Sequence, residues 1–156
     1  MRVAAVLGRA HSAVGQGIRY KLGKGGMNSG LPTPAAGGKC DCTGFVAWCL
    51  GFSRKLNDRF YVDFNGGWFE TTAVWTDVSL NVGIMEPSGK KPGAVLVYPD
   101  ANGHQGHVGL LIDATHVVHC SSSNDATFGD AIQITPLTVF NKNKDTRVGW
   151  LYGLEP

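Results

Sequence analysis

The sequence contains no long hydrophobic run. The apolar patch near its N-terminus is broken at Gly8, Arg9 and His11, so it lacks the apolar core of about 7–15 residues that a signal peptide needs. No segment approaches the roughly 20 apolar residues of a membrane-spanning helix. These absences predict that the chain is cytoplasmic as synthesised and that a membrane is not among its partners.

Charge is also scarce. Charged residues make up 17% of the chain, below the ~25% that is usual for soluble domains, and the formal net charge is +2. No run of Lys and Arg is interleaved with aromatic residues, which argues against a nucleic acid as partner. Hydrophobic residues make up 43%, enough for a core, and the 22 glycines indicate many turns and close backbone approaches.

Cysteine is too rare for a disulfide framework. The chain has four, at Cys40, Cys42, Cys49 and Cys120. A structural zinc site prefers two Cys-x(2–4)-Cys pairs, and here a single tight Cys-x-Cys pair has no counterpart. We therefore expect no metal and no cofactor, although a metal-binding domain remains an alternative of another class. At least one of the cysteines calls for a chemical explanation.

The length of 156 residues suits one domain, covering 1–156. Apolar residues at helical spacing predict an amphipathic helix over 3–16, followed by a loop rich in Gly and Pro. A second helix is expected to start at Cys42. The segment 53–91 is rich in aromatic residues and is expected to contain one short helix around 69–78.

Beyond Gly93 the spacing of apolar residues changes from a helical pattern to one typical of strands. Short runs rich in β-branched residues, separated by turn residues, predict five strands within 94–99, 107–113, 115–121, 131–135 and 147–154. Helices followed by an antiparallel sheet of about five strands define an α+β domain.

Cys42 has the position of a nucleophile. Asp41 is a good N-cap residue, so Cys42 is expected at the start of a helix, where the macrodipole and unpaired N–H groups favour the thiolate. Its backbone N–H is then a natural donor to an oxyanion. Cys49, seven residues on among apolar neighbours, is interpreted as a buried hydrophobe.

A nucleophilic thiol needs a base, and four of the five histidines form two His-x-x-His pairs: His104 with His107, and His116 with His119. If the strands around these pairs form a hairpin, placing His107 opposite His119 centres the turn at Asp113. The other pairings put a turn inside an apolar strand. We therefore predict that His107 and His119 share one face and that Cys120 points to the other.

An activated thiol commonly has a histidine as proton-transfer partner and a second polar side chain that orients this histidine. In this sequence the order is Cys42, His107 and His119. The remaining histidines are interpreted as solvated residues outside the site: His11, His104 and His116.

The same residues resemble a known family. Residues 41–46 resemble the Asp-Cys-Ser-Gly-Phe-Val signature of the NlpC-type bacterial cell-wall cysteine peptidases, with Thr43 in place of Ser. Residues 107–109 resemble the histidine strand of that family, and 119–122 resemble the strand of its third catalytic residue. The tyrosine and glycines of 20–26 look like its Tyr-x-x-Gly-Gly loop. The similarity spans roughly residues 3–152.

The resemblance implies a papain-like core and a cysteine endopeptidase that acts on the stem peptide of peptidoglycan, at the bond between D-glutamate and the diamino acid. The catalytic residues that it implies are Cys42, His107 and His119. The substrate-binding residues are Tyr20, Asp41, Thr43 and Ser121, with Asp41 pairing with a substrate amine.

Several alternatives stay open. The same triad suits an N-acetylmuramoyl-L-alanine amidase or a papain-like acyltransferase, and a non-catalytic domain that binds wall peptides belongs to another class. Because no export signal is recognised, delivery to the wall by a phage or a secretion machine would add a delivery or immunity protein as partner. The aromatic residues of 68–75 are interpreted as core rather than cleft, and Cys40 receives no role.

Overall fold

A computed structural model describes residues 1–156. The helices are α1 (Val3–Ala13), α2 (Cys42–Cys49), α3 (Arg59–Asn65), α4 (Thr71–Leu80), α5 (Ser122–Phe128) and α6 (Thr138–Asn141). The strands are β1 (Arg19–Tyr20), β2 (Lys39–Cys40), β3 (Met85–Pro87), β4 (Val95–Tyr98), β5 (His107–Leu111), β6 (His116–Cys120), β7 (Ile132–Pro136) and β8 (Arg147–Leu151).

The C-terminal half forms the predicted antiparallel sheet, and this confirms the α+β class. Its strand order is β3-β8-β4-β5-β6-β7, with six strands rather than about five. All five predicted strands are present, and the additional strand β3 pairs with β8 at one edge. Strands β5 and β6 are almost wholly buried, as their apolar runs indicate.

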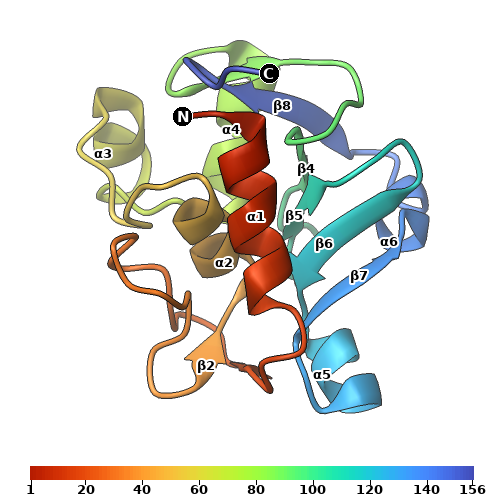
Figure 1. Ribbon diagram of the computed structural model, residues 1–156. Coiled ribbons are helices and arrows are strands. Elements are labelled where there is room, and N and C mark those ends of the chain that lie inside the picture. The colour runs from red at the N-terminus through yellow and green to blue at the C-terminus, as the bar shows by residue number, and fades with distance from the viewer.

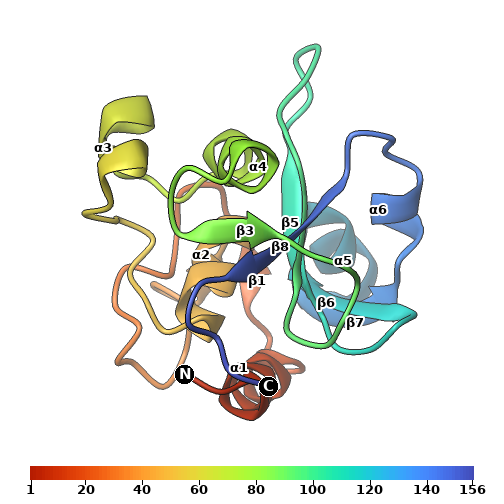
Figure 2. The ribbon, with the colours of Figure 1, turned by 90° about the horizontal axis from the view of Figure 1, so that it is seen from above.

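The N-terminal helices cover one side of this sheet. Helix α2 packs on β5 and β6, and α4 packs on β3, β4 and β8, while α6 packs against β4 (Figure 1). In the view from above, α1, α2 and α4 lie on one side of β5 and α6 lies on the other (Figure 2). Every residue of α2 is buried, so this helix and the sheet strands share one cluster of 34 core residues.

The segment 53–91 contains two helices, α3 and α4, where one was predicted. Helix α3 is short but capped at both ends: the Asp58 carboxylate accepts from Phe60 N–H, and Gly66 ends the helix in the left-handed region at φ 75°. The predicted helix 69–78 is α4, shifted by two residues. The parallel pair β1–β2 and the helices α5 and α6 were not predicted.

The two ends of the chain lie side by side (Figure 1). The N–H of Val3 donates to the carbonyl of Glu155 at 2.8 Å, which ties the start of α1 to the chain end beyond β8. None of the helices has the length and apolar character needed to cross a membrane.

The hairpin of β5 and β6 has a register that differs from the prediction. Leu110 pairs with Val118, so the residue opposite His119 is Gly109 and the turn is centred one residue later than expected. The Asp113 carboxylate accepts from the N–H groups of the two residues that follow Ala114, at 2.7 and 2.8 Å, and this shifts the turn. Since the pairing changes by two residues, both histidines keep the predicted face.

Candidate active site

Cys42 is the first residue of α2, as predicted. Asp41 is the N-cap, with extended backbone, and its Oδ1 accepts from Gly44 N–H at 2.9 Å. The Cys42 side chain is buried, with 3% of the residue exposed, and its backbone N–H has no acceptor within the protein. Residue 42 therefore carries both a thiol and a backbone N–H without an acceptor. Such an N–H can donate to the oxyanion that forms when the sulfur attacks a carbonyl carbon.

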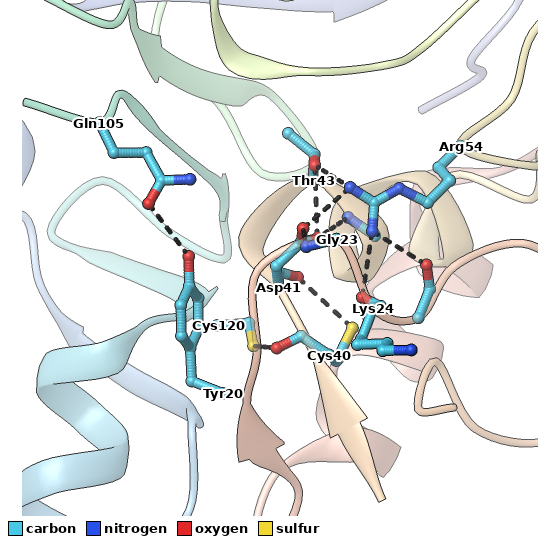
Figure 3. Close-up of polar contacts among 11 residues, drawn as sticks. Tyr20, Gly23, Lys24, Cys40, Asp41, Thr43, Arg54, Gln105 and Cys120 are labelled. Carbon is cyan, nitrogen blue, oxygen red and sulfur yellow. Dashed lines mark hydrogen bonds and ion pairs between the residues drawn. The ribbon is translucent and has the colours of Figure 1, made fainter. Parts of the chain in front are cut away.

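The Asp41 carboxylate has a structural role that the sequence did not reveal. Its Oδ2 accepts from Gly23 N–H at 2.7 Å and from Arg54 Nη2 at 2.8 Å, while Oδ1 binds the N-terminus of α2. Arg54 also donates to Thr43 Oγ1 and to the carbonyls of residues 24 and 25 (Figure 3). Asp41 is 1% exposed and both of its carboxylate oxygens already accept hydrogen bonds within the protein, which argues against the expected pairing of Asp41 with a substrate amine.

The loop before α2 approaches the helix so closely that glycine is required. A Cβ on Gly26 would lie 2.3 Å from the carbonyl oxygen of Gly44, and Gly26 has φ +74°. Gly26 of the loop and Gly44 of the Asp-Cys-Thr-Gly motif therefore serve one contact. This contact, together with the hydrogen bonds of Arg54 to Asp41 and to the carbonyls of residues 24 and 25, fixes the loop that follows Tyr20 against the start of α2.

His107 and His119 are brought together as predicted. Nε2 of His107 lies 2.7 Å from Nδ1 of His119, and the His107 ring stacks on Phe140 of α6 with centroids 5.3 Å apart. Gly109, opposite His119, leaves room for this pair, because a Cβ there would lie 3.1 Å from the Cβ of His119. Nδ1 of His107 makes no hydrogen bond within the protein, which leaves it free for the thiol.

The thiol and His107 are both neutral in the resting site. Burial, followed by the charge of Asp41, raises the pKa of Cys42 to about 12, although N–H groups of Val108 and Thr43 lower it. Burial, with the neighbouring His119, lowers the pKa of His107 to about 3. The expectation that the helix start would favour the thiolate is therefore wrong, because desolvation of the sulfur outweighs the helix dipole.

Two cavities flank the site. The smaller, about 230 Å³, is lined by Cys42 together with Glu70 and Asp100. The larger, about 670 Å³, is lined by both histidines and by Lys142. Gln105 lines both cavities, so the two adjoin at this residue.

The remaining residues expected to bind substrate also line these cavities. Tyr20 lines the larger one, and its hydroxyl donates to Gln105 Oε1 at 3.4 Å (Figure 3). Burial raises the pKa of Tyr20, so this hydroxyl stays a donor. Ser121 caps α5 at the rim of the larger cavity, and Thr43 borders the smaller one while its hydroxyl is held by Arg54.

Several residues of the site were missed in the sequence. Gln105 could have been found, because it precedes His107 by two residues, but the positions of Glu70 and Asp100 depend on long-range packing. Of the aromatic segment, Phe69 is fully buried and Trp68 is 40% exposed, and neither lines a cavity of the site.

The other cysteines and histidines lie outside this arrangement. Cys49 and Cys120 are fully buried, and Cys120 points away from the histidines, its thiol donating to the carbonyl of Cys40. His104 and His116 lie in or beside exposed turns. No group of three or more His, Cys, Asp or Glu side chains is arranged to hold a metal ion.

The role of Asp41 gives a testable expectation. Asp41→Asn leaves the buried Arg54 guanidinium without its counter-charge, so we expect a loss of about 3–5 kcal/mol in the free energy of unfolding, measured with urea. Asp63→Asn is the matched control, because the Asp63–Arg59 pair is exposed and its loss is expected to cost less than about 1 kcal/mol. An Asp41→Asn protein of unchanged stability but raised KM would instead support substrate binding by Asp41.

No family model and no curated protein matches this sequence. Among solved structures, the chain is similar to one described as "Crystal structure of NlpC/p60 domain of peptidoglycan hydrolase SagA", with 17% identity and a TM-score of 0.49, over 96% of this chain and 97% of that chain. That description names the family that the motifs at 41–46 and 107–109 resemble. An identity this low assigns no activity, so function has to be argued from the site.

Proposed function

We propose that the protein is a cysteine peptidase that hydrolyses the peptide stem of peptidoglycan, with Cys42, His107 and His119 as its catalytic residues. The observation that carries the proposal is a helix-start thiol with a free backbone N–H in one cavity and a hydrogen-bonded histidine pair in a second cavity, both cavities being lined by Gln105. A purely structural cysteine needs none of these neighbours.

The chemistry follows from the two neutral groups. As Sγ of Cys42 attacks the substrate carbonyl carbon, the thiol proton moves to Nδ1 of His107, because Nε2 is occupied by His119. The Cys42 N–H stabilises the oxyanion. His107 then returns the proton to the leaving amine, a thioester remains on the sulfur, and a water deprotonated by His107 hydrolyses it.

The cavities support a direction for the bound peptide. The leaving amine takes its proton from His107, so the leaving part belongs in the larger cavity and the acyl part in the smaller one. The smaller cavity carries negative charge from Glu70 and Asp100, whose oxygens already accept from the N–H groups of Ala73 and Gly106. This charge favours an acyl part that bears an amine, and Lys142 offers a cation to carboxylates of the leaving part.

A stem peptide cut after D-glutamate suits this arrangement. Its acyl part is the small dipeptide L-Ala–D-Glu with a free amine, and its leaving part contains the larger diamino acid with its carboxylates. The sizes of the two cavities suit a cut between D-glutamate and the diamino acid, with a short acyl part in the smaller cavity and a longer leaving part in the larger one.

The test is mass analysis of soluble stem tetrapeptides after incubation with the protein. We expect L-Ala–D-Glu as a product, and none with the Cys42→Ala variant. Release of an intact stem peptide from glycan fragments would instead identify an N-acetylmuramoyl-L-alanine amidase on the same triad. Binding of the peptides without any product would identify a non-catalytic wall-peptide domain and overturn the proposal.

A further inference from the structure

The hydrogen-bonded pair of histidines continues to a third residue, Thr135. His119 Nε2 lies 2.8 Å from Thr135 Oγ1. Thr135 is on β7, two residues beyond Gln133, the residue that pairs with His119. Because alternate residues of a strand share a face, His107, His119 and Thr135 form one diagonal row across β5, β6 and β7. The proton positions along this row are therefore linked.

The Thr135 hydroxyl has a single hydrogen, and the structure indicates where it points. Oγ1 lies 3.1 Å from the carbonyl oxygen of Pro136, which can only accept. Donation to Pro136 satisfies this carbonyl and turns the lone pairs of the hydroxyl toward His119 Nε2 at 2.8 Å. Nε2 of His119 is then the ring nitrogen that carries the hydrogen and donates to Thr135.

Asn124 is the other neighbour of this nitrogen and does not compete for it. Its Nδ2 is 3.5 Å from His119 Nε2 but closer to two carbonyl oxygens, those of His119 at 3.3 Å and Ala131 at 3.2 Å. Both amide hydrogens are taken by these carbonyls. The Asn124 amide therefore binds the backbone around His119. The hydrogen bond with Thr135 is the contact that sets which nitrogen of His119 carries the hydrogen.

The tautomer of His119 also determines the tautomer of His107. Burial lowers the pKa of His107 to about 3 and that of His119 to about 4, so each ring carries one proton at neutral pH. With its hydrogen on Nε2, His119 can only accept through Nδ1, and His107 must donate from Nε2 across the 2.7 Å contact. Nδ1 of His107 is then free of hydrogen, the state that a base for the Cys42 thiol requires.

We propose that Thr135 is a positioning residue that, by accepting from His119 Nε2–H, sets the tautomer of both histidines and keeps Nδ1 of His107 proton-free. The inference rests on the proposed function for its catalytic consequence. The tautomers themselves can be measured without any substrate.

Two variants separate the hydroxyl from the shape of the side chain. Thr135→Val removes the acceptor at nearly constant volume, and Thr135→Ser retains it. The measurements are two-bond ¹H–¹⁵N correlation spectra of the full chain labelled with ¹⁵N-histidine, together with kcat and KM on stem tetrapeptides. Thermal unfolding of each variant establishes that it is folded.

For the wild type and Thr135→Ser we expect His107 and His119 both protonated at Nε2, with kcat within about threefold of one another. For Thr135→Val we expect a second tautomer with hydrogen on Nδ1, and a kcat lower by roughly 10- to 100-fold at a KM within about twofold, as for the loss of a residue that orients a catalytic group.

Unchanged tautomers and kcat in Thr135→Val would overturn the inference, and so would a Thr135→Ser protein as impaired as Thr135→Val. If the wild type hydrolyses no stem peptide, the proposed function fails, and the spectra of the same three proteins still decide the role of Thr135.

Discussion

Cys42→Ala is expected to abolish hydrolysis of stem peptides, with a loss of roughly four orders of magnitude or more in kcat. The substitution removes the only atom that can form the thioester, while it keeps the helix start and the backbone N–H of residue 42. Because Cys42 lines a cavity, it is also the thiol that a small alkylating reagent can reach. The variant is therefore expected to lose labelling by iodoacetamide, measured by mass spectrometry.

Cys49→Ala is the matched control for this experiment. Cys49 lies on the same helix and is fully buried, so its loss removes a similar volume without touching the cavity. We expect it to cost about 1 kcal/mol of stability and to leave kcat and labelling at Cys42 unchanged. Hydrolysis by Cys42→Ala at the wild-type rate would refute the assignment of the nucleophile.

His107→Ala is expected to lower kcat by about 10³-fold, within the range found for loss of a general acid–base group. Because burial raises the pKa of Cys42 to about 12, the thiol depends on His107 to take its proton at neutral pH. The same variant is therefore expected to slow alkylation of Cys42, measured as the rate of iodoacetamide incorporation. His119→Ala is expected to cost less, since His119 acts through His107.

His104→Ala is the control for a nearby histidine. It lies on an exposed turn three residues before His107, and we expect no change in kcat or in alkylation rate. Thermal unfolding of both variants distinguishes lost chemistry from lost structure. A large loss in His104→Ala with none in His107→Ala would contradict the assignment of the base.

The parts of the site that could be predicted from the sequence depend on residues that are close together along the chain. The N-cap at Asp41 lies within three residues of the N–H that it binds, so the start of α2 at Cys42 could be located. The face shared by His107 and His119 follows from strand alternation. The exact register of the hairpin did not follow, because backbone N–H groups of the turn donate to the Asp113 carboxylate, and the strand pairing differs from the predicted one by two residues.

The sequence by itself determined the α+β class, the helix that begins at Cys42, the five principal strands and the face that His107 and His119 share, because these depend on capping, periodicity and alternation over short stretches. Only the tertiary structure decided the rest. Arg54 reaches Asp41 from 13 residues away and Tyr20 meets Gln105 from 85 residues away, and no local pattern encodes such contacts. The protonation of Cys42 was decided in the same way, since the desolvation that keeps its thiol neutral comes from everything that the fold packs around it.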